Sequence, residues 1–398
     1  MRTKMDVKLK SILQKEKLEH LLPIFTDQGV TDSILGDLSA DDLRDLGIDK
    51  LGERKRLLSA FAEEIAPVAT DKLERDEPPA TRQEDFTYEA ANGEITITGF
   101  RGKGHVVIPD KFDDLPLPVR AIGKAVFKDN GMILSIKIPN SVTSIEYDSF
   151  HSCSSLASIT IPNSLKAIDT SFFRGCAKLQ EINVNAPCVE YQSIDGVVLD
   201  NTASKIIAFP PGREAYRIPS SVKSIGRNFH CCTGLAKITI PDSVTSIEDL
   251  AFFGCTNLNN IAIPNSVTKI GNRAFRECRN LVSIKLPENL ASIESGTFRE
   301  CYKLYNISIP KSVIKIEEYA FSESGLKSIS IPDGVTHIDN GIFFGCSSLT
   351  NVEIPNSVTT IGNNAFGDCK SLTSISIPNS VANVAKDAFY GCPAWRSV

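Results

Sequence analysis

The sequence predicts a multidomain protein in which a small all-α bundle of five helices precedes a longer α/β solenoid with parallel strands. Residues 6–66 carry leucines at the 3.6-residue spacing of amphipathic helices. Farther along, a motif close to I-P-N-S-V-T returns every 22 or 23 residues with one interruption, a period typical of a solenoid. Such units bury their apolar faces only against their neighbours, so the array predicts a long binding surface rather than an active site.

Composition and charge limit the class of protein. The chain has 398 residues, of which 42% are apolar and 23% charged, so it can fill a core. A net charge of -5 gives no basic footprint, which disfavours nucleic acid as a main partner. The sequence lacks both an 18-residue apolar stretch and the apolar segment of a signal peptide at its start. We therefore expect a cytoplasmic protein without a membrane span.

The first module, residues 6–66, places its apolar side chains in short helical stripes. Ser39 is expected to start one helix, because its oxygen can cap free backbone amides and the acids behind it suit the positive end of the helix dipole. Gly47 is expected to end that helix. Five short helices account for the apolar positions Leu18, Leu21, Leu22, Phe25, Leu35, Leu38, Leu43, Leu46, Ile48, Leu57, Leu58 and Phe61.

This module closely resembles a sterile alpha motif (SAM) domain in Leu18-Glu-His-Leu-Leu-Pro-Ile-Phe25, Leu38-Ser-Ala-Asp-Asp-Leu43 and Leu51-Gly-Glu-Arg-Lys-Arg-Leu-Leu58. In SAM domains generally, an acidic middle surface of one copy docks the start of the last helix of the next. The resemblance therefore implies a homo- or hetero-oligomer, and two unlike patches associate head to tail as a ring or an open helix. The association surfaces expected here are Asp37, Asp41, Asp42, Asp45, Arg54, Lys55 and Arg56. Alternatively, both charged runs are ordinary solvated faces.

Residues 67–85 are polar, charged and proline-containing, and predict a flexible linker to a solenoid over 86–398. In a typical unit Ile375 and Ile377 are expected to face inward, and Ser374 and Ser376 outward, on a short parallel strand that ends at Pro378. A second extended segment follows, and an Ala-Phe pair with a cysteine beyond it predicts one helical turn that closes the unit. This closing phenylalanine stands at Phe127, Phe150, Phe173, Phe229, Phe252, Phe275, Phe298, Phe321, Phe343, Phe366 and Phe389.

The pattern L-x-S-I-x-I-P-x-S-V-T-x-I-G-x-x-A-F-x-x-C resembles the BspA-like class of leucine-rich repeat. The resemblance implies a curved solenoid of about eleven units of 22–23 residues, with a hairpin from Phe86 to Gly99 capping the first unit. Members of this class are often surface adhesins or interaction proteins. The outward strand positions are where a solenoid would bind a partner, and those we single out are Ser158, Thr160, Lys237, Thr239, Asn260, Ser283, Lys285, Asn306, Asn351 and Glu353. Alternative contact points are Phe344, Tyr302 and Tyr305.

One interruption lies between Phe173 and Phe229, a step of 56 residues where two units would take 46. Apolar runs near 188–215 predict a protruding hairpin inserted into the solenoid. We consider two interpretations, a contact point for a partner and a tolerated loop insertion.

Nine of the eleven cysteines occupy the same position of the motif. A straight row suits neither the tetrahedron that zinc requires nor an obvious pairing into disulfides, so we expect small buried thiols. The sole His/Cys cluster is His230-Cys231-Cys232, and we predict no metal and no cofactor. The ladder cysteines are Cys153, Cys176, Cys232, Cys255, Cys278, Cys301, Cys346, Cys369 and Cys392.

The sequence contains no phosphate-binding loop, zinc-protease motif or nucleophile elbow, so we predict that the protein is not an enzyme. The first functional hypothesis is an interaction scaffold or adaptor, whose SAM module sets association and whose solenoid binds a protein partner of unknown identity. The second is a surface or secreted adhesin. The third is a structural spacer.

Overall fold

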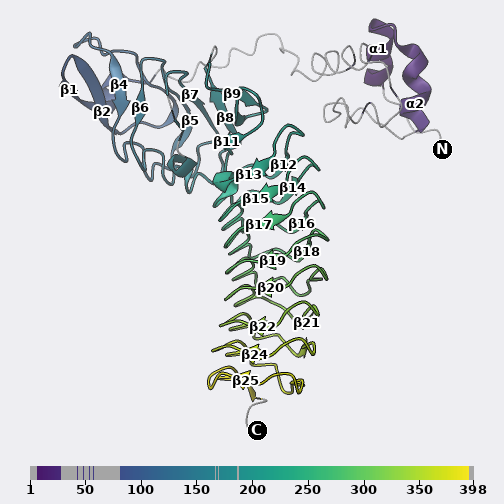
Figure 1. Cartoon of the computed structure of the whole chain (residues 1–398). Helices are drawn as coiled ribbons and strands as arrows, with labels where there is room; N and C mark the ends of the chain where they lie inside the picture. Colours follow the sequence, from purple (N-terminus) through teal and green to yellow (C-terminus); the bar gives the residue numbers. More distant parts are fainter. Residues whose placement is uncertain are drawn as a thin grey trace. The chain divides into compact units, whose positions relative to one another are not determined.

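The computed structural model describes residues 7–27, 43, 48, 53, 57, 81–165, 167–168, 170–185 and 188–393 (Figure 1). The chain divides into two compact units, Met1–Glu77 and Pro78–Val398. The finer boundaries expected from the sequence, after residues 66 and 85, stay predictions.

The described part of the first unit is helical. It contains α1 (Val7–Lys15), the 3₁₀-helix η1 (Glu19–Leu21) and α2 (Leu22–Asp27). Apolar residues of these elements pack with others in one cluster of buried residues, made of Leu9, Ile12, Leu13, Leu18, Leu21, Phe25, Leu43, Ile48 and Leu57. The helical structure that the leucine spacing predicts is confirmed over residues 7–27. The other helices of the expected five-helix bundle lie outside the described residues and stay a prediction.

The second unit begins with a β-hairpin, as expected. The short 3₁₀-helix η3 (Gln83–Asp85) leads into β1 (Phe86–Ala91), which pairs antiparallel with β2 (Glu94–Phe100). The two-residue turn between them is left-handed, with φ of 54° at Asn92 and 79° at Gly93, which matches the twist of a tight hairpin. On its other edge β2 pairs parallel with β4, so the hairpin covers the first turn of the stack.

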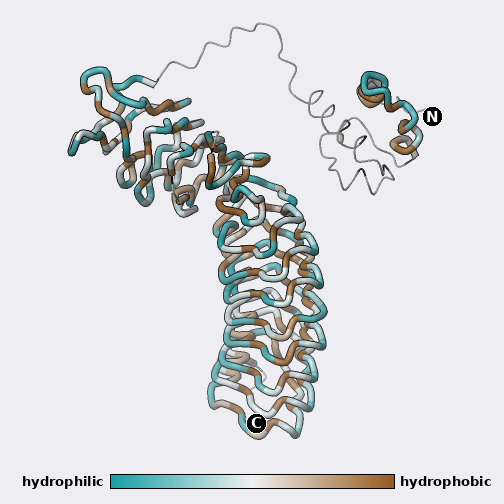
Figure 2. The backbone as a smooth tube through the Cα atoms, turned by 45° about the horizontal axis from the view of Figure 1, so that its top comes forward, coloured by the Kyte–Doolittle hydropathy of each residue, from teal (hydrophilic) through white to brown (hydrophobic). Residues whose placement is uncertain are grey.

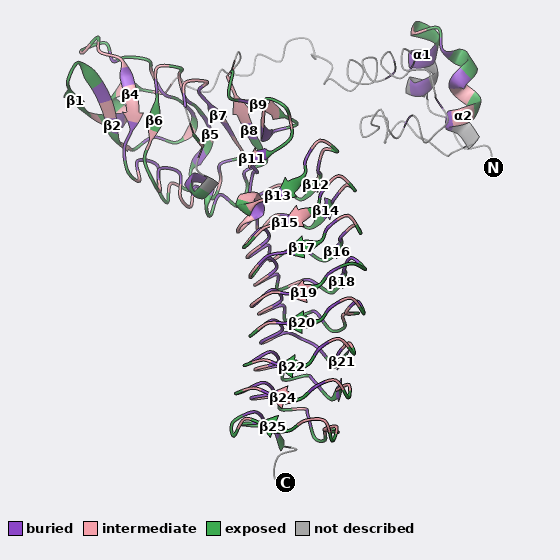
Figure 3. Ribbon diagram, viewed as in Figure 1, coloured by how far each residue is buried: buried purple, intermediate pink, exposed green. Residues whose placement is uncertain are grey.

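The following units add strands to two parallel ladders, and buried apolar residues alternate with exposed polar ones along many of the strands (Figure 3). The first ladder, called the strand face below, contains β3 (Gly104–Val107), β5 (Ile133–Lys137), β7 (Ser158–Ile161), β8 (Glu181–Val184), β12 (Ala215–Arg217), β14 (Lys237–Thr239), β16 (Asn260–Ala262), β18 (Ser283–Lys285), β21 (Ser328–Ser330) and β23 (Asn351–Glu353). Equivalent residues pair in register, for example Ile261 with Ile284.

The second ladder follows the proline. The N–H of Val267 donates to the carbonyl of Pro264 at 3.0 Å, which closes the turn between the two strands of that unit. Here too the register is exact from unit to unit, as in the row Ile225, Ile247 and Ile270. The strands are β4 (Val119–Ile122), β6 (Ser144–Ile145), β13 (Ser224–Ile225), β15 (Ser246–Ile247), β17 (Lys269–Ile270), β19 (Ser292–Ile293), β20 (Lys315–Ile316), β22 (His337–Ile338), β24 (Thr360–Ile361) and β25 (Asn383–Val384).

The closing segment of each unit differs from the expected helical turn. One turn of 3₁₀-helix occurs at η4 (Thr170–Phe173) and η5 (Arg227–Phe229), whereas the other described units close with two successive turns. Residues two positions before and after the phenylalanine have positive φ, such as Arg273 at 53° and Glu277 at 61° around Phe275. A left-handed residue cannot continue a right-handed helix. The fold of this unit is therefore a β-solenoid with parallel strands rather than an α/β one.

The closing phenylalanines form a stack through the core. Successive rings from Phe229 to Phe389 lie nearly parallel, with interplanar angles of 6° to 18° and centroids 5.1 to 5.8 Å apart. Figure 2 shows hydrophobic stretches recurring from one turn to the next along this part of the chain. Offset stacking of buried rings adds to the apolar area that each unit removes from water.

The insertion does not protrude, which corrects the expectation from the sequence. It forms a three-stranded antiparallel sheet of β9 (Tyr191–Ile194), β10 (Val197–Asp200) and β11 (Ile206–Ala208). Val197 and Leu199 belong to the hydrophobic core of the following units, while Val198 belongs to the core of the preceding ones. All three are fully buried, because the sheet separates two cores and is covered on both faces.

Candidate functional site

The strand face carries nine of the ten positions that the sequence singled out, and the tenth, Asn306, lies in a segment that forms no strand. Lys237, Thr239, Asn260, Ser283, Lys285, Asn306, Asn351 and Glu353 are exposed, and Ser158 and Thr160 are half-buried. A shallow hollow of about 670 Å³ brings four of them together, with Lys237, Asn260, Ser283 and Lys285 among its lining residues. The Ser283 hydroxyl donates to Oδ1 of Asn260 at 2.6 Å, so two of these polar groups satisfy each other across neighbouring strands.

The SAM association residues cannot be placed in the same way. Asp37, Asp41, Asp42, Asp45, Arg54, Lys55 and Arg56 all lie outside the described residues. Of the charged residues nearby, Glu53 is described and nearly buried, and its carboxylate lies 3.4 Å from Nε2 of His20.

A second surface lies on the closing turns and includes Tyr302, one of the three alternative contact points that the sequence named. We call it the arginine–tyrosine cluster. Three arginines and three glutamates from successive units are linked by ion pairs, including Arg276 with Glu300 at 2.8 Å and Arg299 with Glu323 at 3.2 Å. The cluster consists of Arg276, Glu277, Arg279, Arg299, Glu300, Tyr302, Tyr319 and Glu323.

The aromatic rings of this cluster are both exposed and held in place. Tyr302 is 46% exposed beneath the guanidinium of Arg279, which lies 5.9 Å from the ring centroid. Tyr319 is 38% exposed, and Arg299 lies 5.9 Å from its centroid. Burial, together with Glu300 and Glu323, raises the pKa of the Tyr302 hydroxyl, which therefore remains a hydrogen-bond donor at neutral pH. The repeated string Phe-Arg-Glu-Cys at 275–278 and 298–301 is the sequence signal that could have revealed this cluster.

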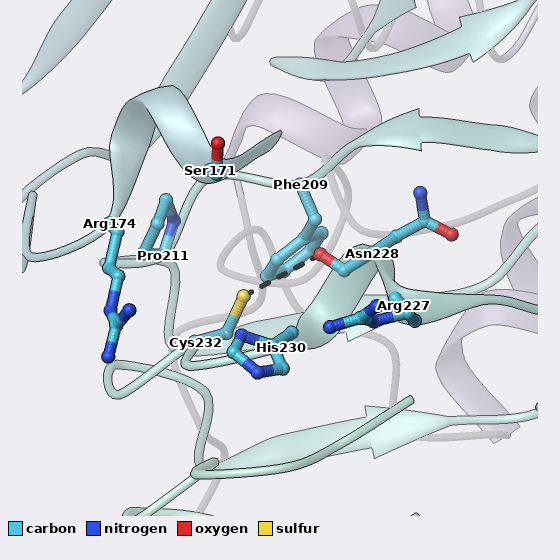
Figure 4. Close-up of a pocket in the computed structure, with 8 residues that line it drawn as sticks. All are labelled: Ser171, Arg174, Phe209, Pro211, Arg227, Asn228, His230 and Cys232. Carbon is cyan, nitrogen blue, oxygen red and sulfur yellow. Dashed lines mark hydrogen bonds between the residues drawn. The ribbon is translucent and has the colours of Figure 1, made fainter. Parts of the chain in front are cut away.

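A pocket of about 440 Å³ marks the interruption of the repeat (Figure 4). In place of a regular closing turn, Phe209 at the end of β11 lies against Phe229 at 4.7 Å with a tilt of 50°, so the parallel stack of rings breaks there. The lining residues come from η4, the segment after β11, and η5 with its following turn, namely Ser171, Arg174, Phe209, Pro211, Arg227, Asn228, His230 and Cys232.

Positive charge dominates this pocket. Arg174 and Arg227 are exposed, and their side chains make no hydrogen bond or ion pair with any residue that the structure describes. His230 is half-buried, and its ring stacks on Phe253 at 5.0 Å. Burial and the positive charges of Arg227 and Arg174 lower the pKa of His230, while Glu277 acts in the opposite direction. No carboxylate lines the described walls of the pocket.

Comparison with protein families decides where the chain belongs. The family model of the BspA type leucine rich repeat region matches residues 120–213, 212–324 and 268–396. The chain belongs to the BspA-type leucine-rich repeat family. Residues 9–63 match the family model of the SAM domain (sterile alpha motif), so both expected modules are confirmed. Domains of both kinds generally serve as modules that bind other proteins.

Solved structures similar to this BspA-type chain include a leucine-rich repeat protein from Eubacterium ventriosum, with 21% identity, a TM-score of 0.49, and coverage of 76% of this chain and 91% of the other. A leucine rich cell surface protein from Faecalibacterium prausnitzii is 28% identical, with a TM-score of 0.48 and coverage of 80% and 88%. At TM-scores below 0.5 these similarities do not bear on function. The comparison with curated proteins found no match.

The row of cysteines in the BspA-type solenoid has a role beyond filling space. The thiol of Cys278 donates to the carbonyl of Phe252 at 3.2 Å, and Cys301 donates to Phe275 in the same way. Each such bond joins one closing turn to the turn before it and satisfies a buried carbonyl. All eleven cysteines are free thiols, and all nine in the row are buried, as expected. Cys232 differs, because the inserted sheet precedes it, and its sulfur lies 3.8 Å from the carbonyl of Asn228.

Within the described ranges, the BspA-type chain has no group of three or more His, Cys, Asp or Glu side chains that could hold a metal ion. The same ranges contain no helix with the length and hydrophobicity needed to cross a membrane.

Proposed function

We propose that this protein is a non-enzymatic scaffold that binds a protein partner through the arginine–tyrosine cluster of its solenoid and associates through its SAM domain. The observation that carries the proposal is the exposure of Tyr302 and Tyr319 beside arginines that ion pairs already hold in place. Tyrosine and arginine dominate the binding energy of protein interfaces. Rings and guanidinium groups that are ordered before binding lose little conformational entropy when a partner docks.

The strand face supports this role less well. The positions singled out on it are serine, threonine, asparagine, lysine and glutamate, and none of these is among the tryptophan, tyrosine and arginine residues that dominate binding. The hollow between Lys237 and Lys285 nevertheless makes it the second candidate surface.

A comparative capture experiment separates the two surfaces. The full chain and two double variants, Arg299→Ala with Tyr302→Ala and Lys237→Ala with Lys285→Ala, are used to capture proteins from a lysate of the source organism. The proposal expects a protein that the wild type and the strand-face variant retain and the cluster variant loses. Loss in the strand-face variant alone would assign binding to the strand face. Identical, nonspecific capture by all three chains would contradict binding and favour the spacer hypothesis.

Self-association through the SAM domain is the second part of the proposal. Opposite charges at Asp42 and Lys55 suit a head-to-tail contact, and linking several solenoids in one assembly raises apparent affinity by ~10² to 10⁴-fold. We expect Asp42→Lys and Lys55→Glu each to reduce the sedimentation coefficient of the full chain, with Glu89→Lys on β1 as the charge-change control. An equal mixture of the two variants should restore one contact and give dimers. Unchanged sedimentation of both variants would refute this contact.

We place the scaffold in the cytoplasm. Eleven free thiols, including two half-buried ones at Cys188 and Cys231, suit a reducing compartment better than an oxidising one. Cell fractionation tests this placement, and recovery of the protein from the cell surface would favour the adhesin hypothesis instead.

A further inference from the structure

The pocket at the interruption concentrates positive charge without a partner for it. Arg174 follows Phe173 at the end of η4, whereas Arg227 begins η5 and His230 follows it, so the three basic groups come from segments on both sides of the inserted sheet. In Figure 4, Arg174 and Arg227 flank the pocket and His230 lies between them. Like charges held around one cavity repel each other, and an anion bound among them removes that repulsion.

The chemistry of the donors defines the anion. A guanidinium presents planar forks of N–H donors that match the oxygens of phosphate and carboxylate groups. The imidazole of His230 adds a further polar group to the lining. Guanidinium and imidazole groups placed around one cavity by separate segments suit a tetrahedral anion, which has oxygens on all sides, better than a planar carboxylate. At about 440 Å³ the cavity admits a phosphate group together with the atom chain that carries it.

We propose that the pocket lined by Arg174, Arg227 and His230 binds a tetrahedral oxyanion of the phosphate or phosphomonoester type. This site is separate from the partner surface that we propose on the arginine–tyrosine cluster, because none of the residues of that cluster lines the pocket. Anion binding can therefore hold or fail independently of the scaffold role.

Proton uptake should accompany binding. Burial and the two arginines lower the pKa of His230, whereas Glu277 raises it. Cys231, which is also half-buried, has its pKa raised by burial and so stays a neutral thiol at neutral pH. A dianion beside His230 favours the imidazolium and raises the pKa of that group. The affinity for an anion of constant charge should therefore increase as the pH falls through the titration range of His230.

Binding is measured on the full chain with four probes. Inorganic phosphate and O-phosphoserine, followed by ³¹P NMR, distinguish a free anion from a phosphorylated side chain, and succinate tests a carboxylate. Sulfate, followed by thermal shift at constant ionic strength, keeps its charge between pH 5 and pH 8 and reports the pH dependence. We expect phosphate or O-phosphoserine to bind at millimolar concentration and sulfate to compete. Stronger binding of succinate would overturn the proposal, as would no binding of any probe.

Three variants locate the site. Arg174→Ala and Arg227→Ala each remove one charge-assisted contact and should weaken phosphate binding about tenfold or more. His230→Gln should abolish the pH dependence of sulfate binding. Arg101→Ala, an exposed arginine of the first turn, is the matched control and should bind as the wild type does. Because Arg174 and Arg227 are exposed, these variants should fold, which far-UV circular dichroism verifies. Wild-type affinity in both arginine variants would refute the site.

Discussion

The buried thiols predict that the solenoid loses stability steeply in mildly alkaline solution. Cys232, Cys255, Cys278, Cys301 and Cys346 are fully buried, and burial raises the pKa of each thiol, to about 11 for Cys346. The ordinary thiol pKa is 9.0, so above that pH the unfolded chain ionises its thiols while the folded chain does not. The stability that these groups contribute is fully present below pH 9.0 and is lost as the pH rises toward the folded pKa.

The size of the effect follows from the number of thiols. Each one costs roughly 1 to 2 kcal/mol of unfolding free energy between pH 7 and pH 10, because one pKa unit corresponds to about 1.4 kcal/mol. The five thiols together cost roughly 5 to 10 kcal/mol, which is comparable to the whole stability of a typical domain. Burial raises the pKa of Tyr191 and of Tyr216 to about 12, but their ordinary pKa is 10.0, so the unfolded chain begins to ionise them only at the upper end of this interval and they add little to the loss.

Urea unfolding followed by far-UV circular dichroism, with a reducing agent and constant ionic strength, measures this loss between pH 7 and pH 10. Cys346→Ala provides the control: it removes one thiol with a raised pKa, so the loss over this interval should shrink by roughly 1 to 2 kcal/mol. At pH 7 the same variant is expected to be less stable by about 1 to 3 kcal/mol, because the carbonyl of Phe321 loses its donor. Stability that stays constant up to pH 10 would show that the thiols ionise in the folded chain, and would refute the reasoning.

Three further predictions concern packing. Phe275→Ala removes a ring that stacks at 5.2 Å on Phe252 and should lower the free energy of unfolding by about 3 to 5 kcal/mol. The control Val282→Ala, at an exposed position, should change it by less than about 0.5 kcal/mol. Equal effects of the two variants in urea unfolding would contradict the stack. Maleimide labelling read by mass spectrometry should modify Cys188 and Cys231 before the nine ladder cysteines, and uniform labelling would argue against their burial. Gly212→Ala places a Cβ 2.6 Å from the carbonyl oxygen of Ala177 and should lower the free energy of unfolding by more than about 2 kcal/mol. Gly93→Ala has open space for the Cβ but a φ of +79°, and should lower the free energy of unfolding by about 1 to 2 kcal/mol. A reversed order of these glycine variants in thermal unfolding would be inconsistent with the contact.

The regular part of the fold could be read from the sequence because its signals are local. Period-two alternation places Ile261 and Ile284 inward, and proline at the end of each strand sets the turn, as at Pro264. Burial of the cysteine row followed from its constant place in the unit. The last unit is less regular: Ile375 and Ile377 are half-buried and lie in no assigned strand.

Where the prediction was wrong, the local signal was ambiguous. Val197, Val198 and Leu199 form a short apolar run, and a run of this kind does not say whether one face or both faces are covered. The expected helical turn failed for a similar reason: non-glycine residues such as Arg273 and Glu277 adopt positive φ only because their neighbours in the stack hold them there.

The sequence by itself determined the period, the parallel strands, the buried rows and the two families, because each depends on spacing within one unit. Only the tertiary structure decided which side chains of different units meet. Arg276 pairs with Glu300, the thiol of Cys278 reaches the carbonyl of Phe252, and Arg174 shares a pocket with Arg227. Each contact joins residues more than twenty positions apart, so it depends on the register between stacked turns and on the sheet that interrupts them, which spacing within a unit does not specify.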